Sequence, residues 1–118
     1  MSKASPIFDD DRLGRRRSKY GAVKTVVDGI TFASAKEARR YSALKLLERA
    51  GEIELLTRQP RFPLVVNGQL VCTYVGDFAY HLKDGTRIVE DVKGFQTEEF
   101  KLKRKLVRAC YGFEIVLS

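Results

Sequence analysis

Apolar and polar residues along the chain follow two periods, one typical of strands and one typical of helices. The segments 23–27 and 30–32 are rich in β-branched residues and flank the turn-forming pair Asp28-Gly29, which predicts a short hairpin. Apolar residues at helical spacing then predict a helix over 34–50. The apolar stripe of this helix comprises Ala38, Tyr41, Leu44 and Leu47.

The middle of the chain predicts an antiparallel meander, because three apolar runs are separated by two turn-forming pairs. Asn67-Gly68 lies between the first two runs and is a strong signal for a tight hairpin. Asp84-Gly85 lies between the second and the third run. The three strands are expected over 61–66, 69–82 and 86–93.

The last third of the chain predicts a second helix over 97–111 and a final strand over 113–117. The residues of this helix that are expected to face inward are Phe100, Leu106, Val107 and Cys110. The predicted fold class is therefore α/β. Its core is a central mixed sheet, made of the three-stranded antiparallel meander and the C-terminal strand, flanked by two helices and preceded by the N-terminal hairpin.

Length and charge indicate one small domain with a polyanionic partner. A chain of 118 residues has the size of a single domain, expected over 20–118. Residues 1–19 are polar and charged, and we expect them to form a flexible basic arm. The formal net charge of +7 favours nucleic acid as the partner. Ribosomal and simple DNA-binding proteins share such a charge, so charge alone does not select an enzyme.

The two cysteines and the hydropathy of the chain predict a cytoplasmic protein. Cys72 and Cys110 lie within apolar patterns without metal-ligand spacing, and we expect both to be buried, reduced thiols. No apolar run approaches membrane-spanning length, and no hydrophobic segment follows the basic N-terminus. Neither a membrane span nor a secretory signal is therefore expected.

Acidic residues of the predicted meander are the strongest candidates for chemistry. Asp91 and Lys93 are two residues apart in a predicted strand and therefore share one face. Asp77 lies in the strand before them. A cation held by Asp77, Asp91 and the main-chain carbonyl of Val92 would support phosphodiester hydrolysis, and Lys93 would position the attacking water. The competing interpretation of an Asp-x-Lys triplet is an exposed salt bridge.

The turn between these strands decides whether the two acids meet. A two-residue Asp84-Gly85 loop would place Asp77 on the face of Glu90 and Val92. A three-residue loop, with Gly85 in the left-handed conformation, would place Asp77 directly opposite Asp91. We favour the second loop, because it alone builds the site. Both acids are expected on the exposed side of the hairpin, where Ala replacements would leave the fold intact and relieve repulsion.

Glu37 is a third acid that the first helix could turn toward the same centre. The segment Ser34-Ala35-Lys36-Glu37 also has the pattern of a capping box, in which the Glu side chain bonds back to the Ser34 amide. The spacing supports the two roles equally.

Basic residues fall into two groups, one in the arm and one on the outer side of the second helix. Either group can be a solvated face, and either can contact phosphates without reading sequence. The candidate DNA-binding residues are Arg15, Arg16, Arg17, Lys19, Lys101, Lys103, Arg104 and Arg108.

These features together resemble the PD-(D/E)XK, or restriction-endonuclease-like, nuclease superfamily. The resemblance rests on the helix acid Glu37, the strand acid Asp77 and the run Asp91-Val92-Lys93, in the order helix, meander, helix, strand. A departure is Gly76, which precedes Asp77 where the superfamily name has Pro. The chain is also similar to a phage and prophage family of short nucleases that resemble Holliday-junction resolvases. This second likeness covers 19–118 and is carried by Lys19-Tyr20-Gly21, Asp28-Gly29-Ile30, Phe32, Ser34, Glu37-Ala38 and Gln59-Pro60.

The resemblance implies a Mg²⁺-dependent DNA endonuclease in which Mn²⁺ can substitute. It implies that Glu37, Asp77, Asp91 and Lys93 occupy the catalytic positions, with Val92 among the metal ligands. The expected substrate is branched DNA, such as Holliday junctions, in phage recombination or packaging within a bacterial host. A homodimer is expected, because cutting both strands of a junction needs two sites. The alternatives are a nicking or single-strand-specific nuclease and a non-catalytic DNA-binding module.

Overall fold

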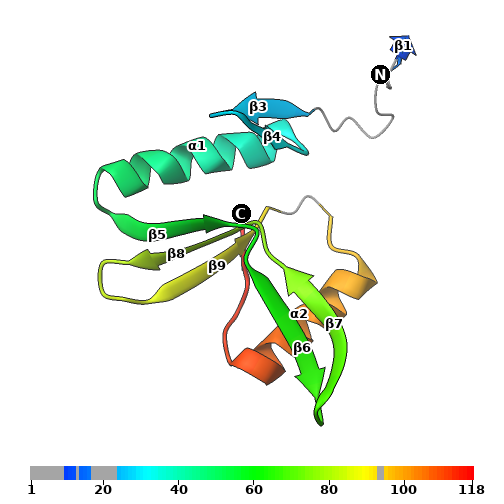
Figure 1. Ribbon diagram of the computed structural model, residues 1–118, viewed down its shortest axis with the longest axis vertical. Coiled ribbons are helices and arrows are strands. Elements are labelled where there is room, and N and C mark those ends of the chain that lie inside the picture. Colours follow the sequence, from blue (N-terminus) through cyan, green and yellow to red (C-terminus); the bar gives the residue numbers. More distant parts are fainter. Residues whose placement is uncertain (1–9, 13, 17–23, 93–94) are drawn as a thin grey trace. The chain divides into compact units, whose positions relative to one another are not determined.

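The structure is a computed structural model that describes residues 10–12, 14–16, 24–92 and 95–118 (Figure 1). The chain forms two compact units, 1–39 and 40–118. Of the expected arm, only β1 (Asp10–Arg12) and β2 (Gly14–Arg16) are described, and they pair antiparallel. The flexibility of this arm and the single domain over 20–118 stay predictions.

The N-terminal hairpin is confirmed by β3 (Thr25–Val27) and β4 (Ile30–Phe32), which pair antiparallel. The two turn residues both have positive φ, 53° at Asp28 and 75° at Gly29. This conformation is the one that two-residue hairpin turns favour, because it matches the twist of the strands.

Helix α1 (Ala35–Arg49) begins directly after Ser34, as predicted. Ala38, Tyr41 and Leu44 of the predicted stripe are buried. Leu47 is exposed at 38%, which corrects the prediction for the end of the stripe. Leu47 lies in the last turn of the helix, after which the chain reverses at Gly51 (φ 80°).

The main sheet belongs to the second unit and has four strands in the order β10-β9-β8-β5. The strand β10 runs parallel to β9, and the other neighbours are antiparallel. The mixed sheet and its C-terminal strand are therefore confirmed, although β10 is shorter than predicted. The strands are β5 (Ile53–Arg58), β8 (Phe78–Leu82), β9 (Arg87–Asp91) and β10 (Val116–Leu117).

The predicted three-stranded meander is wrong, because the strand expected over 69–82 is broken at Gly76-Asp77. Its first part, β7 (Gln69–Val75), pairs with β6 (Arg61–Val66) in a separate two-stranded sheet, and its second part is β8. The partner segment also breaks at this level, between β5 and β6, because Gln59 has a φ of 53° and Pro60 follows it. Two main-chain bonds join the breaks, from the Gln59 amide to the Asp77 carbonyl and from the Gly76 amide to the Pro60 carbonyl, each 3.0 Å long. Figure 1 shows the β6–β7 ribbon turning away from β5 and β8.

Strand β5 was not predicted from the sequence, and its backbone is irregular. Leu55 has a φ of 59°, and the register with β8 shifts between Glu54 and Thr57. Leu55 is exposed at this irregularity. Strand β5 therefore lacks the alternation of apolar and polar residues by which a half-buried strand is recognised in a sequence.

Helix α2 (Glu98–Tyr111) is confirmed, including its end at Gly112, although Thr97 caps the helix instead of forming its first residue. Thr97 Oγ1 accepts a hydrogen bond from the Phe100 amide at 3.0 Å, and Gly112 ends the helix with a φ of 81°. The helix lies beside the β6–β7 ribbon (Figure 1) and packs into a core with one face of β8 and β9. This core consists of Phe62, Leu64, Tyr74, Ala79, Val89, Phe100, Val107 and Ile115.

Two of the four residues that α2 was expected to turn inward are buried, namely Phe100 and Val107. Leu106 is half-buried, and Cys110 is exposed. Cys72 is half-buried, so the prediction of two buried thiols is wrong, although both cysteines are free thiols. Cys110 is the last residue but one of α2, and its Sγ lies 3.5 Å from the Val65 carbonyl, outside the core.

The opposite face of β8 and β9 packs against residues of α1 that belong to the second unit. The rings of Tyr41 and Phe78 stack with their centroids 6.2 Å apart, and Phe78 is fully buried. Alternate residues of β8 therefore point to different helices, Phe78 toward α1 and Ala79 toward the α2 core. Within residues 40–118, the sheet is flanked by two helices, as predicted. Neither α1 nor α2 is long and apolar enough to cross a membrane.

Candidate active site

The turn that joins β8 to β9 has the three-residue form predicted from the sequence. The Leu82 amide donates to the Thr86 carbonyl at 2.8 Å, and the Gly85 amide donates to the Leu82 carbonyl at 2.9 Å. Gly85 has a φ of 90°. The Asp84 carboxylate accepts a hydrogen bond from the Thr86 amide at 2.9 Å, a contact typical of turn-forming Asp.

This turn sets the register of β8 and β9. Phe78 pairs with Glu90 and Ala79 with Val89, as the three-residue turn requires. The Asp77 amide donates at 3.0 Å to the carbonyl of Glu90, which is already the partner of Phe78. The regular ladder therefore ends at Phe78, and Asp77 is not paired directly opposite Asp91 as predicted. The two-residue loop, which would have placed Asp77 on the face of Glu90, is excluded.

Both carboxylates accept hydrogen bonds from neighbouring groups. Asp77 Oδ2 accepts from the Val92 amide at 2.7 Å. Asp91 Oδ2 accepts from the Tyr74 hydroxyl at 2.8 Å. Burial, the hydrogen bond and charge of Asp91, and the charge of Asp77 all raise the pKa of Tyr74, so this phenol stays a neutral donor. The structure thus groups Asp77, Asp91 and Val92 around Tyr74, a residue that the sequence analysis missed.

The exposure of the acids corrects one expectation. Asp91 was placed on the exposed side of the hairpin, but it is 4% exposed, and Asp77 is half-buried. The α2 core and β7 cover this face, which the predicted meander would have left open. Removing the Asp91 carboxylate would leave the buried Tyr74 hydroxyl without its acceptor, so the reason for expecting a harmless Ala replacement does not hold.

A cavity of about 300 Å³ opens beside Asp91. Its lining includes Tyr74, Thr97 and Lys103, so it lies between β7 and the start of α2. Lys103 was expected on the outer side of the helix, but its side chain is 28% exposed and its Nζ lies 3.2 Å from Glu99 Oε2. A cationic side chain therefore reaches the cavity next to the acid.

The positions of two predicted site residues relative to this group stay predictions. Lys93 lies outside the described residues. Glu37 belongs to the first compact unit, where its amide donates to Ser34 Oγ at 3.1 Å. This bond is one half of the predicted capping box, and the described residues show no return bond from the Ser34 amide to the Glu37 carboxylate. The place of Glu37 beside Asp77 and Asp91 stays a prediction.

The donor atoms of the group suit a hard divalent cation. Carboxylate and main-chain carbonyl oxygens are the ligands that Mg²⁺ prefers, and one or two carboxylates commonly hold it together with waters. Asp77, Asp91 and the Val92 carbonyl meet that requirement. A cluster of three or more His, Cys, Asp or Glu side chains able to hold a metal ion is not found within the described part of the chain.

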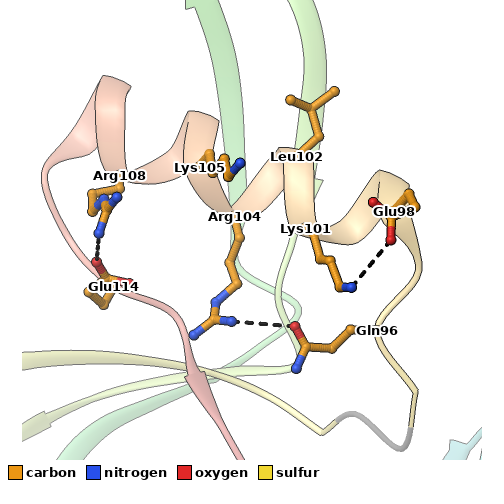
Figure 2. A pocket seen from close by; sticks show the side chains of 8 residues that line it. All are labelled: Gln96, Glu98, Lys101, Leu102, Arg104, Lys105, Arg108 and Glu114. Atoms are coloured by element: carbon orange, nitrogen blue, oxygen red, sulfur yellow. Dashed lines mark hydrogen bonds and ion pairs between the residues drawn. The ribbon is translucent and has the colours of Figure 1, made fainter.

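Basic side chains of α2 line a second, open pocket of about 740 Å³ (Figure 2). Three of the cations facing it have partners. Lys101 Nζ lies 3.2 Å from Glu98 Oε2, Arg108 Nη1 lies 2.7 Å from Glu114 Oε2, and Arg104 Nη1 donates to Gln96 Oε1 at 3.4 Å. The remaining cation of the lining is Lys105. Of the predicted arm residues, Arg15 and Arg16 belong to β2, while Arg17 and Lys19 lie outside the described residues.

On the α1 side of the sheet, Glu90 forms a buried network that the sequence did not predict. Glu90 is 1% exposed, and Arg40 contacts both of its oxygens, Nε to Oε1 at 2.8 Å and Nη2 to Oε2 at 2.5 Å. Tyr80 donates to the same carboxylate. Burial alone would raise the pKa of Glu90, but the bonds from Arg40 and Tyr80 lower it below its usual value. Burial, followed by the bond to Glu90, raises the pKa of Tyr80 to about 12.

A comparison with protein families identifies this chain by its sequence. The family described as "Protein of unknown function (DUF1064)" matches residues 17–116. The chain belongs to this family. The segment shared with DUF1064 contains Asp77, Asp91, Tyr74 and the Arg40–Glu90 pair, together with Glu37 and Lys93. A comparison with curated proteins gives no match.

Proposed function

We propose that this protein is a Mg²⁺-dependent DNA endonuclease with a restriction-endonuclease-like core of the PD-(D/E)XK type. The observation that carries the proposal is the grouping of two carboxylates at the end of the β8–β9 hairpin, where Asp77 accepts a bond from the Val92 amide and Asp91 accepts one from the Tyr74 hydroxyl. Two carboxylates held in one group repel each other, and a cation between them would remove that cost.

Each residue of the group has a role in this proposal. Asp77, Asp91 and the Val92 carbonyl would hold Mg²⁺ or Mn²⁺, and Glu37 would complete the set. A bound ion of this kind stabilises charge on the phosphate and lowers the pKa of a water. Lys93 follows Asp91 by two residues and would orient that water. The bond from Tyr74 to Asp91 and that from the Val92 amide to Asp77 hold the carboxylates in place.

The substrate that we propose is branched DNA, such as a Holliday junction. The net charge of +7 and the basic pocket of α2 favour contacts to phosphates, which give affinity without reading sequence. Cutting two strands of a junction needs two sites, for which a symmetric homodimer is the simplest arrangement. Such an enzyme would act in phage recombination or packaging in the cytoplasm of a bacterial host. A nicking or single-strand-specific nuclease is the alternative activity.

The burial of Asp91 favours a second candidate, a DNA-binding module without catalysis. Asp91 is 4% exposed and bonded to Tyr74, and Asp77 accepts a main-chain amide. Both bonds would also suit acids with a structural role only.

Cleavage assays on four-way junction, flap, duplex and single-stranded DNA separate these candidates. Wild-type protein should cut with Mg²⁺ or Mn²⁺ and lose all activity in EDTA. Asp77→Asn, Asp91→Asn and Lys93→Ala should each abolish cleavage while DNA binding is kept. Asn is chosen because its side-chain oxygen can still accept the bonds from Val92 and Tyr74.

Glu54→Gln is the matched control, because Glu54 is an exposed acid on β5, the neighbour of β8. This variant should cut like the wild type. Wild-type protein that binds branched DNA but cuts none of the four substrates with either metal would favour the binding module. Nicked duplex or degraded single strands as the main product would favour the alternative activities.

A further inference from the structure

Tyr74 makes a close and buried contact with one of the proposed metal ligands. Its side chain is 3% exposed, and its hydroxyl donates to Asp91 Oδ2 at 2.8 Å. A carboxylate that accepts a bond from a fixed phenol has its rotation restricted, because the ring of Tyr74 is itself packed against Phe62 with centroids 6.2 Å apart. The orientation of Asp91 is thus set by a residue of another sheet.

Gly76 provides the space in which this contact forms. A Cβ atom at position 76 would lie 3.3 Å from the Tyr74 hydroxyl and 3.2 Å from Val89 Cγ1. Both distances are tighter than ordinary packing, and Val89 is buried and cannot easily move. Any side chain here would press on the hydroxyl that holds Asp91.

We infer that Tyr74 is a positioning residue for Asp91 and that Gly76 is required because it leaves room for the Tyr74 hydroxyl. The inference rests on the proposed function, and it names a residue outside the expected set of acids and lysine. It also gives a physical reason for Gly76 where the superfamily name has Pro. The hydroxyl holds the carboxylate so that the oxygens of Asp91 and Asp77 are presented together to a cation.

Mn²⁺ binding is the measurement that tests this role apart from cleavage. Free Mn²⁺ is followed by electron paramagnetic resonance as protein is added, with wild type, Tyr74→Phe and Tyr111→Phe compared. Tyr111→Phe is the matched control, because its hydroxyl also donates a bond, to the Pro63 carbonyl at 2.6 Å, and its ring also contacts Phe62. Circular dichroism checks the fold of each variant.

Tyr74→Phe should weaken Mn²⁺ binding by roughly ten- to a hundredfold, as is usual when a residue supporting a metal ligand is lost. The Mn²⁺ concentration for half-maximal cleavage should rise by a similar factor. Tyr111→Phe should change neither quantity. Wild-type affinity in Tyr74→Phe, or equal weakening in both variants, would overturn the inference while the proposed function stands. Wild-type protein that neither binds Mn²⁺ nor cuts DNA would overturn both.

Gly76→Ala tests whether Gly76 is required to leave room for the Tyr74 hydroxyl. This variant also replaces Tyr74→Phe as the test if Tyr74→Phe does not fold. The added methyl should weaken Mn²⁺ binding in the wild-type background, because it displaces the hydroxyl. In the Tyr74→Phe background the same change should weaken binding by a smaller factor, because the hydroxyl is already gone. Equal factors in the two backgrounds, or wild-type affinity in Gly76→Ala alone, would overturn the role of Gly76.

Discussion

The contact between Arg40 and Glu90 predicts that replacing one partner costs more stability than replacing the other. Glu90 is 1% exposed, whereas the Arg40 side chain is 32% exposed. Arg40→Met removes the guanidinium and leaves an ionised carboxylate buried. Glu90→Gln leaves a guanidinium that can turn toward water. The first change should therefore cost more stability than the second.

The expected magnitudes follow from burial. Removing one partner of a buried ion pair typically costs about 3–5 kcal/mol, because the remaining charge has lost its compensation. Arg40→Met should lower the free energy of unfolding by about 3 kcal/mol, the lower end of this range, because Tyr80 still donates to Glu90. Glu90→Gln keeps a hydrogen-bonding side chain of the same shape and should cost about 1 kcal/mol. The difference, about 2 kcal/mol, is well above the error of a denaturation experiment.

Urea unfolding in metal-free buffer at pH 7 shows which of the two variants is less stable. The same measurement at lower pH shows whether the charge of Glu90 is the cause. In the wild type, the pKa of Glu90 is lower in the folded protein than its ordinary value of 4.5 in the unfolded chain. This difference stabilises the folded state above pH 4.5, and the stabilisation is lost as the pH falls from 4.5 toward the lower folded-state pKa. In Arg40→Met, burial without a partner raises the pKa of Glu90, so acid relieves the penalty. The gap between the two proteins should narrow as the pH falls from 7 through 4.5.

Arg39→Met is the control for the loss of one arginine from α1, because Arg39 is exposed and adjacent. It should change the free energy of unfolding by less than about 0.5 kcal/mol. The reasoning is refuted if Glu90→Gln costs more than Arg40→Met, or if the gap to the wild type is the same at both ends of the pH range.

Two further predictions concern the site and the arm. Asp91→Ala should lower the free energy of unfolding by about 1–3 kcal/mol relative to Asp91→Asn, because only Asn keeps an acceptor for the buried Tyr74 hydroxyl; equal urea midpoints would show that this bond contributes nothing. Neutralising Arg15, Arg16 and Arg17 together should weaken DNA binding and make the binding constant depend less on salt concentration. An unchanged slope of the binding constant against salt would show that the arm does not contact DNA phosphates.

The features predicted well from the sequence are those that depend on neighbouring residues. The three-residue turn depends on Asp84 and Gly85, and the start and end of α2 depend on Thr97 and Gly112. Such motifs satisfy main-chain groups within a few residues, so the local sequence contains the whole cause. The turn fixes the register of β8 and β9 as far as Phe78 and Glu90. The irregular bond of Asp77 beyond that point could not be predicted from the turn.

The features that were missed depend on residues far apart in the sequence. Arg40 and Glu90 are separated by 50 positions, and neither has a pattern that indicates the other. The break of the long hairpin needs Gln59-Pro60 on one side and Gly76-Asp77 on the other, joined by main-chain bonds. Each pair alone is compatible with an ordinary strand end. Only the two together show that the ribbon bends.

The bend that makes the meander prediction wrong is also what brings Tyr74 to Asp91. In an unbroken strand, Tyr74 and Asp77 would be three residues apart and would point to opposite faces of the sheet. In the register of β8 and β9, position 74 would lie opposite position 94, about 10 Å along the strand from Asp91. The observed bond from the Tyr74 hydroxyl to Asp91 is 2.8 Å long, so it exists only because β7 leaves the line of β8 at Gly76. Gly76, the residue that directly follows β7, lies at this bend and leaves the space that the hydroxyl occupies.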